Sequence, residues 1–413
     1  MKSQDVIVIG AGIIGVSIGL ELQKSGFKVK IIDRDQPGQG ASFGNAGAFA
    51  FSDIVPLATP GIIKVAPRWL LDPLGPLSIP PSYALTIVPW LLKFFRASWS
   101  DRFPALMSAQ VELMTLSRDA LERQVMSCNG EKFLLREGQL RLYDNEALFR
   151  RALPYWDACR EYGIKHELLH SNEAIGEIQP GLDPRFKFAG YTPNWINTRD
   201  PKKWFDHLFA TFLSRGGEFL TQSAQSLSFD NDLASVHCDG ETLPAKFIVV
   251  SAGAWSKNLA VSIGDNAPLE TERGYNTTLA EDKVGLRTHL TFPDHGFVVS
   301  KNEQGLRVGG AVELGGLSAP PNFKRSENLL KKAKKFLPGL VGSEGKEWMG
   351  FRPSMPDSLP VLGTSSRSRR VLYAFGHGHL GLTQAAATGE LIRNAVLGQP
   401  WPISKKPFSI TRF

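Results

Sequence analysis

Residues 5–15 read DVIVIGAGIIG, an apolar run that leads into three closely spaced glycines. The valines and isoleucines of residues 5–9 predict a parallel strand that is buried on both faces. Residues 16–24 continue with helical periodicity, and residues 28–32 (KVKII) follow as a second candidate strand. Together these segments predict a strand, a helix and a second strand, which is the unit that binds a dinucleotide.

The three glycines have different roles in such a unit. Gly10 makes the tight turn after the strand, Gly12 lets a pyrophosphate approach the backbone, and Gly15 allows the helix to pack closely on the strand. The free N–H groups at the start of the helix, near Ile13 and Ile14, favour the negative charge of the phosphates. This spacing, in register with both strands, makes a chance glycine-rich turn a poor explanation.

Asp33 ends the second strand, where a carboxylate accepts hydrogen bonds from both ribose hydroxyls. Its negative charge disfavours a 2′-phosphate, so NADP is the poorest candidate, while NAD and FAD both remain. Two features favour FAD: the motif opens the chain, and a second glycine-rich cluster, residues 38–47, follows the acid directly. A flavin needs such backbone, because peptide N–H groups against its ring tune its electronics.

Composition narrows the classes of function. The chain has 413 residues, 42% of them hydrophobic and 21% charged, which is typical of a globular protein of two or three domains. The net charge of +7 is too small to indicate nucleic-acid binding without a clustered patch. The dense basic segment, residues 324–337, alternates with leucine and phenylalanine and predicts the exposed face of an amphipathic helix.

Cysteine and histidine usage predicts a cytoplasmic protein without a metal site. Cys128, Cys159 and Cys238 are far apart and odd in number, which favours a reducing compartment. The histidines and cysteines also lack the spacing of metal ligands.

Residues 54–95 are apolar and aromatic and contain eight prolines. No uninterrupted apolar run here reaches the roughly 18 residues of a membrane-spanning helix, and the prolines would break one. Two interpretations remain. The first, which the prolines favour, is short helices packed irregularly on the core. The second is a surface that dips into the inner face of the cytoplasmic membrane, with four interfacial anchors: Trp69, Trp90, Lys93 and Arg96.

Four parts of the sequence carry a more specific signal. They are the N-terminal unit with Asp33-Arg34, residues 41–47 (ASFGNAG), residues 247–256 (FIVVSAGAWS), and the C-terminal pair 350–357 (GFRPSMPD) and 376–383 (GHGHLGLT). These segments resemble the FAD-dependent D-amino acid oxidase superfamily, and within it the bacterial D-amino acid dehydrogenases of the small-subunit type. The resemblance spans essentially the whole chain.

The resemblance implies an α/β fold with two discontinuous domains. An FAD-binding Rossmann-like domain of the glutathione reductase type would comprise residues 1–50, 166–260 and 350–413. An α+β substrate domain built on an antiparallel sheet would comprise residues 51–165 and 261–349. Because no cysteine falls in the C-terminal flavin segment, FAD is expected to be bound non-covalently.

The residues expected to contact FAD lie in the same segments. They are Gly10, Gly12, Ile13, Ile14, Gly15, Asp33, Arg34, Ser42, Asn45, Ala46, Gly47, Ser251, Ala252, Gly253, Gly378, His379, Leu380, Gly381, Leu382 and Thr383. The last glycine-rich loop would let the helix over residues 383–397 aim its N-terminus at the flavin pyrimidine ring, which stabilises negative charge there.

Arg352 is the first candidate for a substrate contact. Its context, Trp348 to Phe351, is apolar, and a guanidinium is costly there unless it meets an anion. The alternative is a structural ion pair with the nearby Asp357. The resemblance implies that Arg352 binds the substrate carboxylate.

Five other residues have weaker signals. Tyr275, in a segment that resembles the family's Gly-Tyr turn, would either donate a hydrogen bond to the substrate carboxylate or pack as an aromatic. His377 would bond flavin or substrate, or pack as a neutral histidine. The dehydrogenases compared usually have a small polar residue in place of His379, which makes His379 a candidate for substrate choice. Glu313 is expected to be a structural carboxylate, and Asp200 to cap the next helix.

The reaction implied by the resemblance is dehydrogenation of a D-amino acid, with D-proline and hydroxy-D-proline types as leads. Hydride would pass from the α-carbon to flavin N5 while Arg352 clamps the carboxylate. The apolar segment after Asp53 favours a quinone or dye-type electron acceptor. Alternatives are a glycine- or sarcosine-type amine oxidase that makes hydrogen peroxide, the flavoprotein subunit of a multi-subunit dehydrogenase, and an NAD-dependent dehydrogenase.

Overall fold

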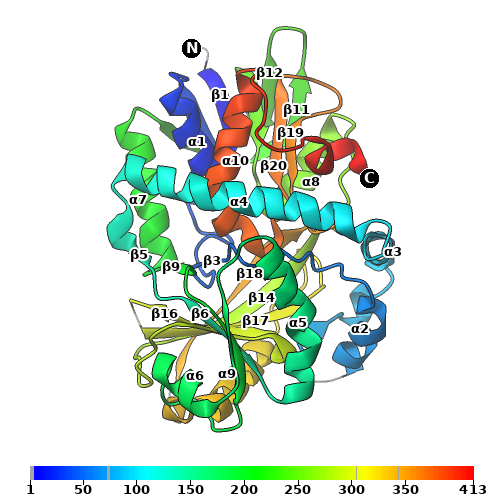
Figure 1. Ribbon diagram of the computed structural model, residues 1–413. Coiled ribbons are helices and arrows are strands. Elements are labelled where there is room, and N and C mark those ends of the chain that lie inside the picture. The colour runs from blue at the N-terminus through cyan, green and yellow to red at the C-terminus, as the bar shows by residue number, and fades with distance from the viewer. Residues whose placement is uncertain (1–3, 72–74, 304, 343) are drawn as a thin grey trace.

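The computed structural model describes residues 4–71, 75–303, 305–342 and 344–413. Two large sheets organise the chain: an eight-stranded sheet in the upper half of Figure 1 and a nine-stranded sheet in the lower half. The long helix α4 (Phe103–Cys128) crosses the view between them.

The eight-stranded sheet is built on parallel strands. In order across the sheet these are β10 (Glu218–Thr221), β2 (Val29–Asp33), β1 (Gln4–Ile9), β13 (Glu241–Val250) and β20 (Val371–Phe375). Antiparallel strands complete it: β11 (Ala224–Phe229), β12 (Ala234–Cys238) and β19 (Val361–Thr364). Helix α1 (Ile13–Lys24) follows β1, which confirms the predicted strand, helix and second strand.

The nine-stranded sheet is mainly antiparallel, as predicted. Its order is β18 (Gly345–Ser354), β14 (Glu270–Leu279), β17 (Gly305–Glu313), β16 (Phe297–Asn302), β15 (His289–Phe292), β6 (Gln139–Tyr143), β8 (Phe188–Thr192) and β7 (Glu167–Leu169), with β4 (Leu77–Ser78) beside β17. Two pairs, β6 with β15 and β4 with β17, are parallel. Their members are far apart in the sequence, so no hairpin forces them to run antiparallel. A small third sheet contains β3 (Ala48–Phe49), β9 (Ile196–Thr198) and β5 (Leu134–Leu135).

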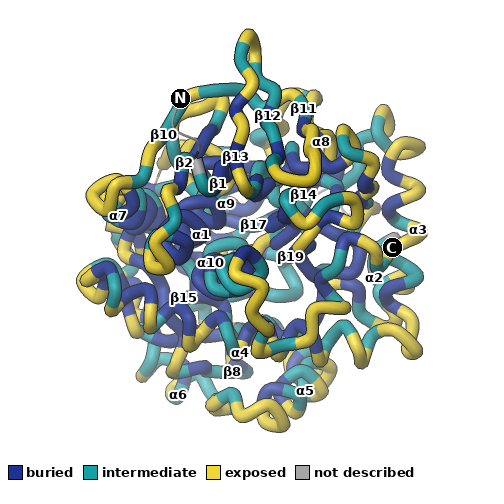
Figure 2. The backbone as a smooth tube through the Cα atoms, turned by 90° about the horizontal axis from the view of Figure 1, so that it is seen from above, coloured by how far each residue is buried: buried dark blue, intermediate teal, exposed yellow. Residues whose placement is uncertain are grey.

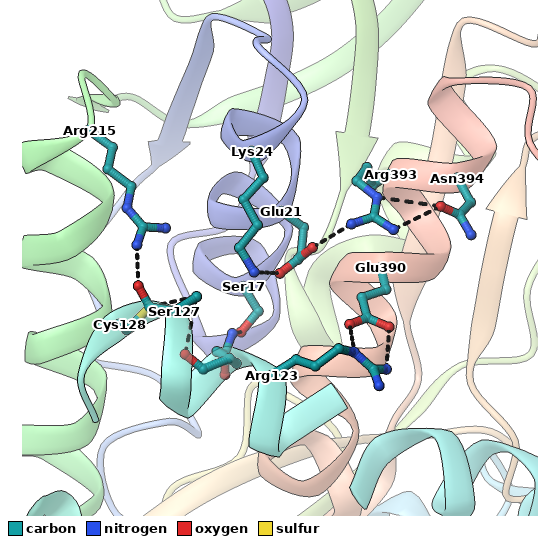
Figure 3. Close-up of polar contacts among 11 residues, drawn as sticks. Ser17, Glu21, Lys24, Arg123, Ser127, Cys128, Arg215, Glu390, Arg393 and Asn394 are labelled. Atoms are coloured by element: carbon teal, nitrogen blue, oxygen red, sulfur yellow. Dashed lines mark hydrogen bonds and ion pairs between the residues drawn. The ribbon is translucent and has the colours of Figure 1, made fainter. Parts of the chain in front are cut away.

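Helices α1 and α10 (Gly381–Val396) lie side by side, and α4 packs across them (Figure 3). The buried Glu21 carboxylate accepts from Arg393 Nη1 at 2.9 Å and from Lys24 Nζ at 2.5 Å. Arg123 of α4 donates two hydrogen bonds of 2.8 Å to Glu390 of α10. These bonds fix the C-terminal helix against the N-terminal unit, although the two are at opposite ends of the chain.

The other helices confirm two predictions. They are α2 (Ile62–Leu71), α3 (Val88–Ala97), α5 (Glu146–Glu161), α6 (Asn172–Ile178), α7 (Pro201–Ser214), α8 (Ser256–Ser262) and α9 (Lys324–Phe336). The basic segment forms the amphipathic helix α9, and Asp200 caps α7 by accepting hydrogen bonds from the N–H groups of Lys202 and Lys203.

Residues 54–95 contain the short helices α2 and α3, with exposed residues at the rim of the molecule (Figure 2). Trp90, an interfacial anchor in the second interpretation of this segment, is buried and stacks on Phe94 at 5.3 Å, as the first interpretation expects. Among the described residues, no helix is both long and apolar enough to cross a bilayer.

Three expected boundaries differ from the sheets. The predicted change of domain at residues 349–350 falls inside β18. Strands β7 and β8 belong to the nine-stranded sheet, although residues 166–260 are assigned to the cofactor domain. Helix α4, assigned to the substrate domain, packs on α1 and α10 of the cofactor half. Composition could not reveal these exchanges, because each depends on contacts between segments distant in sequence.

Candidate active site

A cavity of about 1000 Å³ lies between the two large sheets. One end is lined by the carboxyl ends of parallel strands, at Ile9, Asp33 and Ser251. The other end is lined by the nine-stranded sheet, including Arg141 and Arg352. Ligands of open α/β sheets bind beyond the carboxyl ends of the strands, which is where this cavity begins.

Close backbone contacts shape the first end. Gly10 has φ of +109°, and a Cβ on it would lie 2.4 Å from the carbonyl oxygen of Ser251. A Cβ on Gly15 would lie 2.0 Å from the carbonyl oxygen of Gly10. Only glycine fits both places, so the start of α1 is brought against the ends of β1 and β13.

Asp33 and Arg34 line the cavity at the end of β2. Asp33 Oδ2 accepts a 2.7 Å hydrogen bond from the N–H of Ala11, which places its carboxylate beside the glycine loop. The Arg34 guanidinium lies 3.9 Å from the ring centroid of Trp255. Trp255 also lines the cavity but was not predicted as a site residue.

The glycine-rich loop of residues 42–47 is held from both sides. Ser42 Oγ accepts from the N–H of Ile13 at 2.9 Å, and the Asn45 side chain bonds the Ser42 carbonyl and the Gly47 N–H at 2.9 and 2.8 Å. From the opposite sheet, Asn276 Nδ2 donates to the Gly44 carbonyl at 2.7 Å and Arg307 Nη1 to the Asn45 carbonyl at 2.5 Å. The loop is therefore clamped between the two sheets.

The C-terminal loop brings two histidines to the cavity. His377 is buried and lies 3.0 Å from Thr388 Oγ1, and burial lowers the pKa of His377 to about 3. His379 is exposed in the cavity. The surrounding protein and Arg352 lower the pKa of His379, while Asp53 and Glu272 act in the opposite direction. Both rings are neutral at pH 7 and leave the arginines as the positive charges of the cavity.

Arg352 is directed into the cavity by its neighbours on β14 and β17. Its Nη1 donates to the carbonyl of Ala311 at 3.0 Å, and a Cβ on Gly274 would lie 2.3 Å from its Nη2. Burial lowers the pKa of Arg352, and Glu272 opposes that shift. The alternative pairing with Asp357 is wrong, because Asp357 binds Arg412 at 2.6 Å.

Tyr275 is placed differently from the expectation. Its segment is not a turn but the middle of β14. The hydroxyl donates to the Glu313 carboxylate and accepts from the N–H of Asn322 at 3.0 Å. Burial raises the pKa of Tyr275, and Glu313 also acts to raise it. The phenol is thus already satisfied by protein groups, and Glu313 takes the structural position expected of it.

Most of the residues expected to contact the cofactor line this cavity. Those outside its lining are Gly15, Gly47, Leu380 and Thr383. Thr383 holds the neighbouring backbone instead: its Oγ1 accepts from the N–H of Ala50 at 3.0 Å.

The sequence did not single out four polar residues that line the cavity, three on the nine-stranded sheet and one, Asp53, in the segment after β3. They are Asp53, Arg141, Glu272 and His289. Arg141 Nη1 lies 3.5 Å from Asp53 Oδ1, and burial lowers the pKa of His289 to about 3. Alternation along β6 and β14 could have identified Arg141 and Glu272, because residues two apart face the same side of a strand.

A glycine-lined nucleotide end joined by one cavity to an arginine-bearing sheet defines a dinucleotide-dependent oxidoreductase. Residues 5–395 match the family model described as FAD dependent oxidoreductase, and the chain belongs to that family. This confirms the predicted superfamily, the enzyme class and FAD as the cofactor.

Relatives align along the whole chain. It is 36% identical to a D-amino-acid oxidase of Bradyrhizobium diazoefficiens over 422 residues, which cover 100% of this chain and 99% of the relative. It is 28% identical to a D-amino acid dehydrogenase of Rhizobium rhizogenes, with 99% of each chain covered. The fold is similar to that of glycine oxidase from Geobacillus kaustophilus, with a TM-score of 0.80, 21% identity and 99% of each chain covered.

The residues present fit FAD. A Cβ on Gly12 would meet only Ser42 Oγ, at 3.3 Å, so this glycine leaves the backbone open to the cavity at the start of α1. The adjacent N–H groups and the Asp33 carboxylate match a pyrophosphate and a ribose.

We predict that Gly12→Ala lowers FAD affinity at least tenfold while the protein still folds, because the added methyl group enters the space a pyrophosphate needs. Affinity is measured by titrating FAD into apoprotein and following flavin fluorescence. Gly176→Ala is the control, since a Cβ at Gly176 meets nothing within 4 Å. Equal FAD affinities in the two variants would contradict this use of Gly12.

Proposed function

We propose that this protein oxidises a D-amino acid at its α-carbon, with Arg352 holding the substrate carboxylate. The observation that carries the proposal is the position of Arg352 in the cavity that the cofactor loop also lines. Among the described residues, its guanidinium has one protein hydrogen bond, to the carbonyl of Ala311. The names of the two curated relatives support the substrate class. FAD, when bound, supplies the acceptor for the hydride that leaves the α-carbon.

The protein's own residues would bind the substrate and the cofactor and orient them toward each other. Arg352 offers two parallel N–H donors to a carboxylate, which fixes the direction of the α-carbon. Gly10 to Ile14, Asp33, Arg34, residues 42–47 and residues 251–253 would hold FAD, with the loop 378–383 beside them. His377, neutral and bonded to Thr388, would keep that loop in place. Tyr275 would act through β14, because its hydroxyl is bound to Glu313.

Aromatic walls suit an apolar or cyclic side chain. Trp195, Phe297 and Trp348 line the cavity with Arg352. A D-proline or hydroxy-D-proline type of substrate would place its ring against them, and this remains our lead. The alternatives are an amine oxidase of the glycine or sarcosine type and a flavoprotein subunit that needs a partner chain.

The visible spectrum of the purified anaerobic protein tests the proposal. We expect a yellow protein that is bleached by certain D-amino acids and not by their L-enantiomers. Bleaching by glycine or sarcosine alone would favour the amine oxidase instead, and a flavin that no amine bleaches would favour the subunit. If the yellow colour returns quickly when air is admitted and hydrogen peroxide is formed, oxygen is the electron acceptor.

We predict that Arg352→Ala raises KM for the D-amino acid at least a hundredfold and leaves FAD bound, because a charge-assisted bidentate contact is lost. Steady-state kinetics and the ratio of flavin to protein absorbance provide the two measurements. Arg287→Ala, at an exposed arginine outside the cavity lining, is the control. Unchanged KM in Arg352→Ala would remove this residue from the substrate site.

For the electron acceptor we propose a membrane quinone, reached from the cytoplasmic side. Leu57 and Pro76 line the cavity, and Ile63 and Leu70, which lie between them in the sequence, have exposed side chains. Leu85 and Leu92 are 88% and 63% exposed, and Lys93 beside them is exposed as well. Apolar residues with a neighbouring cation are typical of a surface that rests in a lipid headgroup layer.

We predict that the double variant Leu85→Asp/Leu92→Asp binds vesicles of phosphatidylethanolamine and phosphatidylglycerol at least tenfold more weakly. Each buried leucine contributes about 1.5–3 kcal/mol. Vesicle flotation measures the bound fraction. Val261→Asp, an exposed apolar position on α8, serves as the control. If the unaltered protein does not float with vesicles, the membrane proposal fails while the proposed oxidation still stands.

A further inference from the structure

Glu272 is a buried carboxylate without a hydrogen-bond partner among the described residues. It lies on β14, is 5% exposed and lines the cavity. Within the described part of the chain, no donor lies within hydrogen-bond distance of this carboxylate, and no lysine, arginine or histidine nitrogen lies within 4.0 Å of it. A carboxylate enclosed in a cavity without a protein partner is available to a cationic ligand, whose charge compensates its own.

Arg352 is the cross-strand neighbour of Glu272. The two residues are paired directly in the antiparallel register of β14 and β18, so both side chains lie on the same face of the sheet. Opposite charges at such positions usually form an ion pair. Here the guanidinium instead lies over Gly274 and donates to Ala311, which leaves the two charges side by side and unpaired.

The other carboxylates that line the cavity already have partners. Asp33 accepts from the N–H groups of Ala11 and Asp35, Asp35 pairs with Arg34 at 3.1 Å, and Asp53 lies 3.5 Å from Arg141. Of the carboxylates in the described lining, Glu272 is the one left for a cation.

We infer that Glu272 binds the ammonium group of the substrate while Arg352 binds its carboxylate. In an α-amino acid these two charges are separated by a single carbon, and an adjacent but unbonded carboxylate and guanidinium match that arrangement. Neighbouring groups do not disturb the match: His379 is neutral and Asp53 is held by Arg141. The inference rests on the proposed function, because it takes Arg352 as the carboxylate site. It implies discrimination against carboxylates that lack an amine.

Two ligands that resist oxidation separate the two contacts. 2-Aminoisobutyrate carries both charges but has no hydrogen on its α-carbon, and pivalate replaces its ammonium with a methyl group of similar size. Calorimetric titration of the FAD-loaded protein gives both dissociation constants. We expect the unaltered protein to prefer 2-aminoisobutyrate at least tenfold.

Glu272→Gln should abolish this preference: the affinity for 2-aminoisobutyrate should fall at least tenfold, and the affinity for pivalate should not change. Glu272→Asp, which keeps the charge, should restore part of it. Glu270→Gln is the matched control: it lies two residues earlier on the same strand, outside the cavity lining, and its carboxylate accepts from Tyr83 at 2.9 Å.

Three results would contradict the inference: no preference in the unaltered protein, no change in Glu272→Gln, or an equal loss of both ligands in Glu272→Gln. Failure of the proposed function gives a different pattern. In that case Arg352→Ala would bind both ligands as tightly as the unaltered protein does.

Discussion

The structure depends on how closely three backbone segments approach at the end of β1. The carbonyl of Gly10 occupies the place where a side chain of Gly15 would be, and the carbonyl of Ser251 occupies the place of a Gly10 side chain. Because no side chain separates them, α1 begins directly beside the ends of β1 and β13. The free N–H groups of α1 then face the cavity, and Asp33 reaches the N–H of Ala11. The nucleotide end of the cavity follows from these contacts.

The end of the cavity that contains Arg352 also depends on a glycine. Gly274 lies between Glu272 and Asn276 on the same face of β14, and the Arg352 guanidinium occupies the space above it. A larger residue would push that guanidinium away. The strand therefore presents a carboxylate, a gap filled by a neighbouring guanidinium, and an amide that reaches the cofactor loop. The proposed contact for the substrate ammonium and the support for the cofactor loop thus come from one strand, beside an irregularity in its pairing with β17.

The sequence predicted the parts of this arrangement that are encoded locally. The spacing of Gly10, Gly12 and Gly15 predicted the nucleotide unit. The apolar context of Arg352 predicted that its guanidinium binds an anion. Tyr275 was placed in a turn because Gly-Tyr resembles one, whereas pairing with β17 and β18 makes it a strand. Because side chains alternate between the two faces of a strand, Tyr275 and Glu272, which are three residues apart, lie on opposite faces of β14. The pairing is between distant segments, and local sequence does not contain it.

The clamp on residues 42–47 limits how far the two halves of the protein can be exchanged. Asn276 and Arg307 belong to the sheet that forms the substrate end, yet their side chains hold the carbonyls of Gly44 and Asn45. Trp348, from β18, fills the space beside Gly44. Grafting this sheet onto the nucleotide unit of a distant relative would therefore remove support from the cofactor loop unless these three side chains came with it. In this protein, the sheet that carries Arg352 and the loop of residues 42–47 are joined at this contact, so a change in one is felt by the other.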